Sequence, residues 1–359
     1  MKITGIKCRV LTFQTKTLAT SYGRGVTERK HVLVRLETDG GAIGYGEASP
    51  LPHFTGEVGE TIAWIIENRL APVLVGLDVF DVETFHAAME KAIPRHTTAK
   101  ASLVMAAYDA MGKAAGLPVC RLLGGRFRDR LPVAGAVGIE DPDATAAEAA
   151  KYVREGARTI KLKIGADPAR DVEAVAAVRA AVGPDVAIRV DANQGYLPKM
   201  AIQVIKTLAS YNLQYVEQPV SAHDLEGLAF VRRSVDVPIA VDESLYGTDE
   251  AMEIIRREAA DSFVIKLIKA GGIYRGRQVA AIAQAARIPC TLVSPYESTL
   301  GSAANVHVAA SAPNASWAVE IGFSDVKNDP CSGLEYSGGF VEVPDRPGLG
   351  VAVAEEVFG

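Results

Sequence analysis

The 359-residue sequence has little of what marks several specialised classes of protein. Its four cysteines form no CxxC pair, so we expect neither a disulfide framework nor a zinc site. No apolar run approaches the ~18 residues that a membrane span requires. The first residues, MKITGIKCRVLTF, also lack the apolar core of a signal peptide. We therefore expect a cytoplasmic protein that makes no membrane contact.

The sequence also lacks an excess of positive charge and several well-known catalytic motifs. It has 38 Lys and Arg against 43 Asp and Glu, a net charge of −5, which argues against a nucleic-acid partner. The absence of GxxxxGK[ST], GxSxG and GxGxxG excludes P-loop, serine-hydrolase and dinucleotide-binding motifs. The six histidines are isolated, and no HxH pair suggests a zinc hydrolase. A content of 48% hydrophobic residues is enough for a large core.

The first 126 residues differ in pattern from the rest of the chain. They begin with β-rich segments joined by a tight-turn signal, Asp39-Gly40-Gly41. Three helical stretches follow, and the last one stops at Gly116. The predicted strands cover residues 2–13 and 31–38, and the predicted helices cover residues 58–71, 80–93 and 98–115. Strands followed by helices favour an α+β domain over residues 1–126.

From about residue 130, short β-rich runs alternate with Ala-rich amphipathic helices. The eight runs cover residues 131–137, 159–165, 186–193, 213–219, 238–244, 262–268, 289–295 and 317–322. Eight such units predict an α/β protein with a (β/α)₈ barrel of the TIM type over residues 127–340. An open doubly wound sheet is the alternative, but the glycines of residues 41–46 are in the wrong order for a dinucleotide-binding turn. We expect the tail, residues 341–359, to return to the N-terminal domain and complete it.

Acidic residues end three consecutive predicted strands of this barrel. Asp191, Glu217 and Asp242 would converge on one arc of the barrel mouth, where the catalytic groups of such barrels lie. Three carboxylates on a rigid rim suit Mg²⁺, with Mn²⁺ as a second possibility. The alternative is that each carboxylate pairs with a neighbouring Lys or Arg. That explanation is weaker for three acids in register than it is for one.

Lysines flank the acidic arc on both sides. Lys161 and Lys163 are two residues apart and therefore share one face of their strand. Lys266 ends a strand on the opposite wall of the barrel. Burial beside other cations lowers the pKa of a lysine, and Lys161 next to Lys163 meets that description. This pattern suits a base that removes a proton α to a carboxylate, although each lysine alone is explained as well by neutralisation of the acids.

Five short motifs mark the ends of the predicted strands, and a helical segment covers residues 106–125. The motifs are KLK at 161–163, DAN at 191–193, EQP at 217–219, DES at 242–244 and KLIKAGG at 266–272. Together they resemble the enolase superfamily, in its muconate lactonizing enzyme subgroup, over essentially the whole chain. The resemblance implies a magnesium-dependent isomerase of a small-molecule carboxylate, with the N-terminal domain capping the barrel mouth. We also expect a homo-oligomer.

The resemblance implies a role for each charged residue. Asp191, Glu217 and Asp242 would be the Mg²⁺ ligands. Lys163 and Lys266 would form the acid/base pair on opposite faces of the substrate α-carbon, and Lys161 would hold the carboxylate and lower the pKa of Lys163. Asn193, Gln218 and Ser244 would orient these groups, a function that metal sites commonly require.

Two loops of the N-terminal domain, residues 17–30 and 48–57, are candidates for substrate selection. The first has the glycines of a mobile lid. The candidate substrate-binding residues are Tyr22, Arg24, His53, Phe54, Thr55, Tyr296, Glu297, Ser298 and Glu320. Arg24 and Arg29 are candidates for a distal substrate carboxylate, although solvated surface charge is the more frequent role of arginine.

Which reaction of the subgroup is catalysed depends on a few positions. Opposed lysines suit a racemase or epimerase of an amino-acid derivative: an N-acylamino acid, a dipeptide or a proline-type compound. Dipeptide epimerases resembling this chain carry Asp-x-Asp on the eighth strand, where this sequence has Glu320-Ile321-Gly322. A glutamate there resembles muconate cycloisomerases, although residues 294–305 lack their Gly-rich turn. We therefore expect a racemase or epimerase, with cycloisomerisation, dehydration of a hydroxyproline-like acid and a non-catalytic relative as alternatives.

Overall fold

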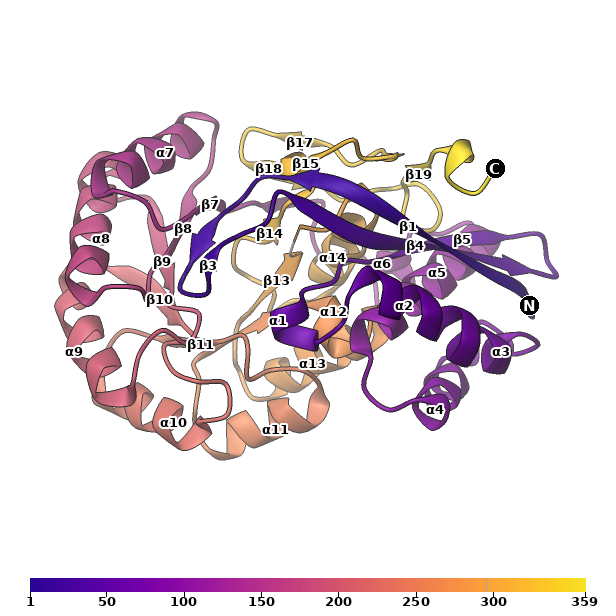
Figure 1. Cartoon of the computed structure of the whole chain (residues 1–359), viewed down its shortest axis with the longest axis horizontal. Coiled ribbons are helices and arrows are strands. Elements are labelled where there is room, and N and C mark those ends of the chain that lie inside the picture. Colours follow the sequence, from indigo (N-terminus) through magenta and orange to yellow (C-terminus); the bar gives the residue numbers. More distant parts are fainter. Residues whose placement is uncertain (295) are drawn as a thin grey trace.

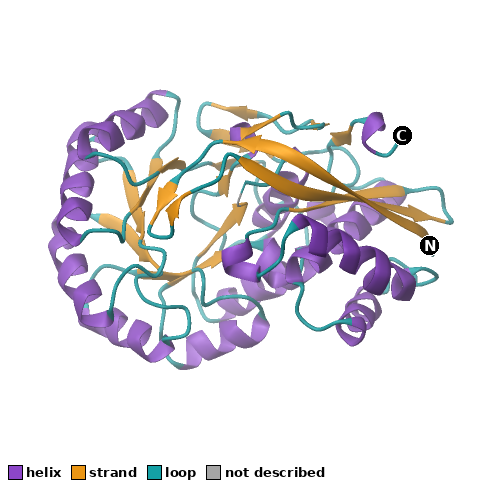
Figure 2. Ribbon diagram, viewed as in Figure 1, coloured by secondary structure: helices purple, strands orange, loops and turns teal. Residues whose placement is uncertain are grey.

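The structure is a computed structural model that describes residues 1–294 and 296–359, with Arg24 described in its backbone alone. Figure 1 shows a ring of strands surrounded by helices, beside which lies a long N-terminal sheet with its own helices. The chain therefore has the predicted (β/α)₈ barrel with an α+β unit at its N-terminus. Figure 2 shows the alternation of strands inside and helices outside around the ring.

The N-terminal sheet is antiparallel and has the strand order β15-β1-β4-β5. Its strands are β1 (Ile3–Thr15), β4 (Glu28–Thr38), β5 (Ile43–Ala48) and β15 (Val326–Lys327), with the small hairpin β2 (Ala19–Thr20) and β3 (Gly23–Arg24) between β1 and β4. Its helices are α1 (Pro52–Thr55), α2 (Gly59–Ile65), a π turn η1 (Ile66–Leu70), α3 (Ala71–Leu74), α4 (Val82–Ala92), α5 (Thr97–Ala115) and α6 (Val119–Leu122). The hairpin and the three helical stretches predicted from the sequence are confirmed.

The glycines of β5 allow helix α5 to lie directly on the sheet. A Cβ atom at Gly44 would be 1.9 Å from the carbonyl oxygen of Ala106, and one at Gly46 would be 1.9 Å from that of Ser102. Any side chain at these positions would push the helix away. The glycine-rich segment at 41–46 therefore serves close packing of helix on strand.

The barrel has eight parallel strands in the order β7-β8-β9-β10-β11-β12-β13-β14. They are β7 (Gly135–Val137), β8 (Thr159–Lys163), β9 (Ala187–Asp191), β10 (Leu213–Glu217), β11 (Ile239–Val241), β12 (Ser262–Ile265), β13 (Cys290–Ser294) and β14 (Glu320–Ile321). The backbone NH of Val319 donates to the carbonyl of Pro132 at 2.8 Å, and that of Ala134 donates to the carbonyl of Val319 at 2.9 Å. These bonds join the residues just before the first and last strands of the ring.

Helices cover the outside of the barrel, as the sequence predicts. They are α7 (Pro142–Arg154), α8 (Pro168–Val182), α9 (Pro198–Leu208), α10 (Leu225–Ser234), α11 (Thr248–Arg256), α12 (Leu267–Ala270), α13 (Ile273–Ala285) and α14 (Thr299–Ser311). The prediction of one strand at 131–137 is wrong in one respect, because two separate strands lie in this segment. Its first part, β6 (Arg130–Pro132), pairs with β18 (Phe340–Glu342) of the tail, and only β7 belongs to the barrel.

The C-terminal tail contacts both parts of the molecule. Strand β18 pairs with β6, and β16 (Cys331–Ser332) pairs with β19 (Ala352–Val353). The backbone NH of Leu349 donates to Asp109 Oδ1 of helix α5 at 2.8 Å, which ties the tail to the N-terminal unit as predicted. The tail therefore also pairs with the segment that leads into the first barrel strand, a contact that was not predicted from the sequence.

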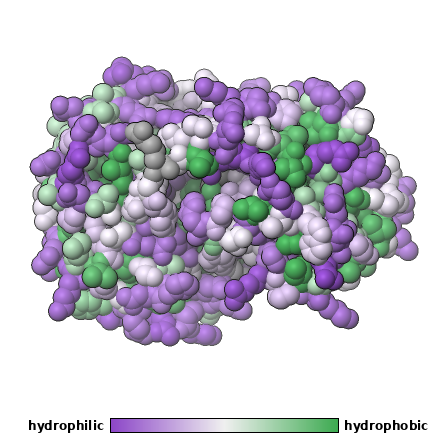
Figure 3. All heavy atoms as spheres, in the orientation of Figure 1, coloured by the Kyte–Doolittle hydropathy of each residue, from purple (hydrophilic) through white to green (hydrophobic). Residues whose placement is uncertain are grey.

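Among the described residues, no helix is long and apolar enough to cross a membrane. The face of the molecule in Figure 3 is mostly hydrophilic, with apolar side chains in small separate groups. The apolar residues are instead concentrated in one large core that extends through the barrel wall and the N-terminal unit.

Candidate active site

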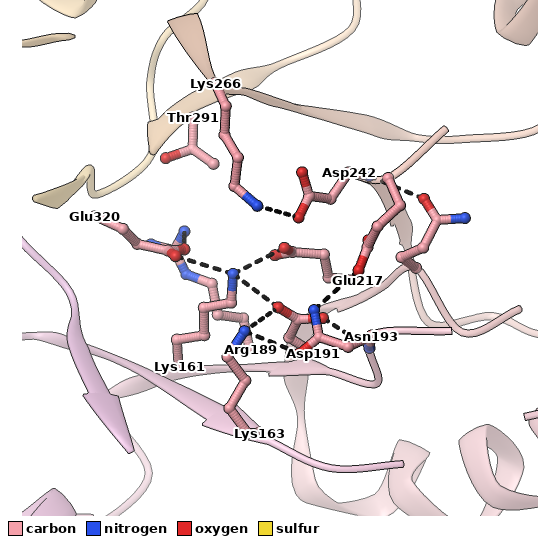
Figure 4. A network of polar contacts seen from close by, with 12 residues as sticks. Lys161, Lys163, Arg189, Asp191, Asn193, Glu217, Asp242, Lys266, Thr291 and Glu320 are labelled. Carbon is pink, nitrogen blue, oxygen red and sulfur yellow. Dashed lines mark hydrogen bonds and ion pairs between the residues drawn. The ribbon is translucent and has the colours of Figure 1, made fainter. Parts of the chain in front are cut away.

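Three carboxylates meet at one edge of the barrel because they end neighbouring strands. Asp191 and Glu217 are the last residues of β9 and β10 and lie opposite each other in the parallel register, and Asp242 follows β11 directly. One oxygen from each lies within 4.8 Å of the others, and all three side chains are buried. Figure 4 shows the three pointing toward a common centre. The predicted acidic arc is thus formed by the fold.

Lysine ammonium groups surround these carboxylates from two sides. Lys163 Nζ lies 2.6 Å from Asp191 Oδ2, and Lys161 Nζ lies 2.8 Å from Glu217 Oε1. Lys266 follows β12 and its Nζ lies 2.5 Å from Asp242 Oδ2. In Figure 4 Lys266 approaches from the side opposite to Lys161 and Lys163. The geometry places an amine on each side of the acidic centre.

The charges in this cluster shift one another strongly. Burial alone would lower the pKa of Lys161, but the charges of Asp191, Glu217 and Glu320 raise it well above its ordinary value. The direction is the reverse of that expected from the sequence, because carboxylates and not Lys163 dominate its surroundings. Burial also acts against a charged Lys266, yet Asp242 and Glu243 raise its pKa.

The acidic centre fits a divalent cation. Burial and the charge of Asp191 raise the pKa of Glu217, and Glu217 Oε2 is buried with no hydrogen-bond partner in the described part of the chain. A buried polar atom without a partner is costly unless something binds it. Three carboxylates with oxygens this close supply the hard ligands that Mg²⁺ and Mn²⁺ prefer.

The residues expected to orient the ligands lie next to them. The backbone NH of Asn193 donates to Asp191 Oδ1 at 2.9 Å, and Asn193 Oδ1 accepts from Lys163 Nζ at 3.0 Å. Gln218 Oε1 accepts from the backbone NH groups of Asp242 at 3.1 Å and Ser244 at 3.2 Å. These bonds tie the ends of successive strands together.

Two buried cations of the site were missed from the sequence. Lys269 Nζ lies 2.6 Å from Asp242 Oδ1, so this carboxylate binds two lysines. Arg189 lies inside the barrel and donates to Tyr215 Oη at 2.8 Å and to Glu320 Oε1 at 3.2 Å. The sequence could have predicted the position of Arg189. It lies two residues before Asp191 in an apolar strand, so its side chain must be on the same face of that strand as Asp191.

A cavity of about 750 Å³ lies over the site and is bounded by both parts of the molecule. Lys161, Lys163, Lys266, Asn193 and Glu320 line it from the barrel, as do Tyr22, Arg29, His53, Phe54 and Tyr296 from the loops above. Tyr22 Oη donates to Glu243 Oε1 at 2.7 Å, and the ring of Phe54 lies 4.4 Å from Lys266 Nζ. The predicted loops therefore do cover the barrel mouth.

Arg29 is half-buried in this cavity. It is therefore not the fully solvated surface charge that is the more frequent role of an arginine. Its guanidinium stacks on the ring of Tyr296 at 3.9 Å, and it has no carboxylate partner among the described residues. The side chain of Arg24 lies outside the described part of the structure.

Three of the predicted substrate contacts lie elsewhere. Thr55, Glu297 and Ser298 are not among the described residues that line the cavity. Glu297 is fully buried and accepts from Asn305 Nδ2 at 2.8 Å. Ser298 Oγ caps helix α14 and donates to Glu47 Oε2 at 2.6 Å. Ser298 therefore connects the N-terminal unit to the barrel, whereas Glu297 bonds to a helix of the barrel itself.

Comparison with known proteins identifies relatives over the whole length. Residues 7–124 match the N-terminal domain of mandelate racemase / muconate lactonizing enzyme, and residues 144–357 match the enolase C-terminal domain-like family. The N-succinyl-L-Arg/Lys racemase of Bacillus cereus is 36% identical, over 100% of this chain and 97% of the relative. Muconate cycloisomerase 1 of Rhodococcus opacus is 34% identical, over 91% of this chain and 89% of the relative.

Solved structures agree with this relationship. The dipeptide epimerase of Cytophaga hutchinsonii, in complex with Mg and the dipeptide D-Ala-L-Val, superimposes with a TM-score of 0.95. It is 31% identical, and the match covers 99% of this chain and 97% of that one.

Proposed function

The chain belongs to the mandelate racemase / muconate lactonizing enzyme family of the enolase superfamily, and the relatives named above are isomerases. We propose that it is a magnesium-dependent racemase or epimerase of amino-acid derivatives. The observation that carries this proposal is the placement of two lysines. Lys163 and Lys266 lie on opposite sides of one acidic centre and line the same cavity. A racemase needs this arrangement, since one group removes a proton and the other returns it to the opposite face.

Asp191, Glu217 and Asp242 would hold the Mg²⁺, with Mn²⁺ as a second suitable ion. A bound cation supplies stabilisation of the negative charge that develops on the substrate carboxylate when the α-proton leaves. Lys161, which lies between Glu217 and Glu320, adds a positive charge beside that carboxylate. Phe54 and Tyr22 cover the mouth and limit access of water to the reacting carbon.

The cavity favours a substrate whose amino group is part of an amide. Arg29 offers a partly buried positive charge with no carboxylate partner in the described structure, suited to an acyl carbonyl or a second carboxylate. Glu320 is already bound by Lys161 and Arg189, and Gly322 lacks a side chain. N-acylamino acids and dipeptides therefore fit better than a free amino acid, and the racemase and epimerase relatives agree with this.

Cycloisomerisation of a muconate-type acid is the second candidate. It is supported by Glu320 in the cavity and by the cycloisomerase relative. Both reactions form or quench a carbanion next to a carboxylate, but only racemisation moves the proton between two faces of one carbon.

Deuterium exchange distinguishes these reactions. The Mg²⁺-loaded protein is incubated in D₂O with N-acylamino acids, dipeptides, proline derivatives and cis,cis-muconate. A racemase incorporates deuterium at the α-carbon of both stereoisomers. Conversion of muconate to a lactone, with no exchange in the other compounds, would instead show a cycloisomerase, and loss of a hydroxyl group would show a dehydratase.

The two lysines are then separated by single substitutions. Lys163→Ala and Lys266→Ala should each abolish racemisation, while each keeps exchange of the one stereoisomer whose proton faces the remaining lysine. Lys199→Ala, at an exposed position of helix α9, is the matched control and should behave as the unsubstituted protein. Racemisation by both single variants would contradict the two-base mechanism.

A further inference from the structure

Glu320 connects two buried cations inside the barrel. Its Oε2 lies 2.9 Å from Lys161 Nζ, and its Oε1 accepts from the guanidinium of Arg189 at 3.2 Å. The carboxylate is only slightly exposed at the edge of the cavity, and both cations are buried. Figure 4 shows the ammonium group of Lys161 between Glu320 on one side and the carboxylates of Asp191 and Glu217 on the other.

The guanidinium of Arg189 is itself fixed by groups from two other parts of the barrel. It reaches from β9 to the chain that enters β14, where it donates to the carbonyl of Ala318 at 2.8 Å. It also donates to Tyr215 Oη of β10 at 2.8 Å, and both of these side chains are fully buried. Arg189 therefore holds Glu320 in one orientation, in which the second carboxylate oxygen points to Lys161.

Lys161 has three carboxylate partners within the described structure, and two of them belong to the proposed metal site. Its Nζ lies 2.8 Å from Glu217 Oε1 and 3.1 Å from Asp191 Oδ2. A bound divalent cation is the largest charge in such a site, so these two carboxylates have less charge to offer a lysine once they hold Mg²⁺. Glu320 is then the partner that keeps the buried ammonium group paired.

We propose that Glu320 and Arg189 are positioning residues for Lys161. Arg189 orients Glu320, and Glu320 draws the ammonium group of Lys161 away from the metal carboxylates so that it can face the substrate. This inference rests on the proposed racemase or epimerase function and deepens it, because Lys161 supplies the positive charge beside the substrate carboxylate. Loss of Glu320 should therefore slow the reaction of every substrate alike, and it should let Lys161 compete with Mg²⁺ for Glu217 and Asp191.

Mg²⁺ binding in the absence of substrate tests this competition. Calorimetry compares the unsubstituted protein, Glu320→Gln, Lys161→Met and the double variant, after urea unfolding has verified that each is folded. The direct effect of the lost negative charge on Mg²⁺ is the same with and without Lys161, so a difference between the two losses of affinity measures the competition. We expect Glu320→Gln to weaken Mg²⁺ binding by roughly 10-fold more when Lys161 is present, the strength of one hydrogen bond to a charged group.

Glu335→Gln, at an exposed position, is the control for net charge and should bind Mg²⁺ as the unsubstituted protein does. An equal loss of Mg²⁺ affinity in Glu320→Gln with and without Lys161 would overturn the inference.

The second test is α-proton exchange with N-acetyl-L-leucine and L-alanyl-L-leucine, which share the leucine carboxylate. Glu320→Gln should lower kcat by roughly 10- to 100-fold, by the same factor for both compounds, because Lys161 acts at the group that they share. A larger loss for the dipeptide, whose amino terminus is free, would show that Glu320 contacts the substrate and would overturn the inference.

Arg189→Lys tests the other half of the proposal. Lysine keeps the positive charge but offers a single nitrogen in place of the forked guanidinium, so it should lower kcat by less than Glu320→Gln does. If Arg189 acts through Glu320, Arg189→Lys should cause no further loss in a chain that already carries Glu320→Gln, and fully additive losses would refute this. Absence of exchange by the unsubstituted protein, together with the expected Mg²⁺ result, would contradict the proposed function alone.

Discussion

Replacement of Glu297 by glutamine tests which of two buried carboxyl groups, Glu47 or Glu297, carries the proton where the N-terminal unit meets the barrel. Glu47, from β5, accepts from the backbone NH groups of Ser298 and Gly301, each at 2.9 Å, and lies 2.7 Å from His31 Nδ1. Burial opposes its ionisation, but His31 and Ser298 lower its pKa below the ordinary value. Glu297, one residue before Ser298, has far fewer donors.

The magnitude follows from the pKa of Glu297. Burial and the charge of Glu47 raise it from 4.5 to about 8. Between these pH values the folded protein keeps a proton that the unfolded chain loses, so the free energy of unfolding falls as pH rises through this window. Each unit of pKa difference corresponds to about 1.4 kcal/mol, which sets an upper limit of roughly 4 kcal/mol between pH 5 and pH 8. Glutamine has the shape of the protonated carboxyl group and cannot ionise.

Urea-induced unfolding at pH 5, 6, 7 and 8 measures this effect. The unsubstituted protein should lose stability relative to Glu297→Gln as pH rises, and the difference should level off above pH 8. Glu335→Gln, at an exposed position, controls for the removal of one charge and should follow the unsubstituted protein. Parallel pH profiles for the unsubstituted protein and Glu297→Gln would refute the assignment of a protonated Glu297.

Two further predictions concern the metal site and the packing of the N-terminal unit. Glu217→Gln should weaken Mg²⁺ binding, measured by calorimetry, by about 100-fold, because the buried oxygen without a partner is lost as an anionic ligand. Glu335→Gln is the control, and an equal Mg²⁺ affinity of the two variants would contradict the assignment of Glu217 as a ligand. Gly46→Ala should destabilise the protein by about 3 kcal/mol, measured by urea unfolding, because its Cβ would overlap the carbonyl of Ser102. Gly5→Ala meets only the flexible end of the Glu37 side chain and is the control, so equal stability of the two variants would refute this reason.

The barrel and its acidic centre were predictable because both follow from periodicity. Parallel barrel strands all present their carboxyl ends at one mouth, so the residue that ends a strand is placed by the strand's position alone. Asp191, Glu217 and Asp242 each end a recognisable apolar run, and the structure brings them together. Lys161 and Lys163 share a face for an equally local reason.

The parts that were not predicted depend on contacts between segments far apart in the sequence. The strand expected at 131–137 divides because the tail supplies β18 as a partner for its first half. Glu297 and Ser298 follow a barrel strand and were therefore predicted to lie at the barrel mouth. Glu47, about 250 positions earlier, instead binds Ser298, and neither residue is among those described as lining the cavity. Periodicity in the sequence predicts on which side of a strand or helix a residue lies. It does not predict which group from a distant part of the chain will contact that residue.

Glu320 shows how this distinction bears on function. In the sequence, Glu320 is a single acidic residue at the end of the eighth strand. The dipeptide epimerases that this chain resembles carry two acids there, and muconate cycloisomerases carry one. The sequence therefore suggested that this position distinguishes epimerisation from cycloisomerisation. In the structure its two oxygens are bound by Lys161 of β8 and Arg189 of β9. A carboxylate neutralised in this way has little charge left for a substrate, whichever reaction the family member catalyses. The charge of Arg29, which lines the cavity and stacks on Tyr296, is not neutralised in this way by a carboxylate of the described residues. Substitution of Arg29 should consequently change substrate choice more than substitution of the acid on the eighth strand.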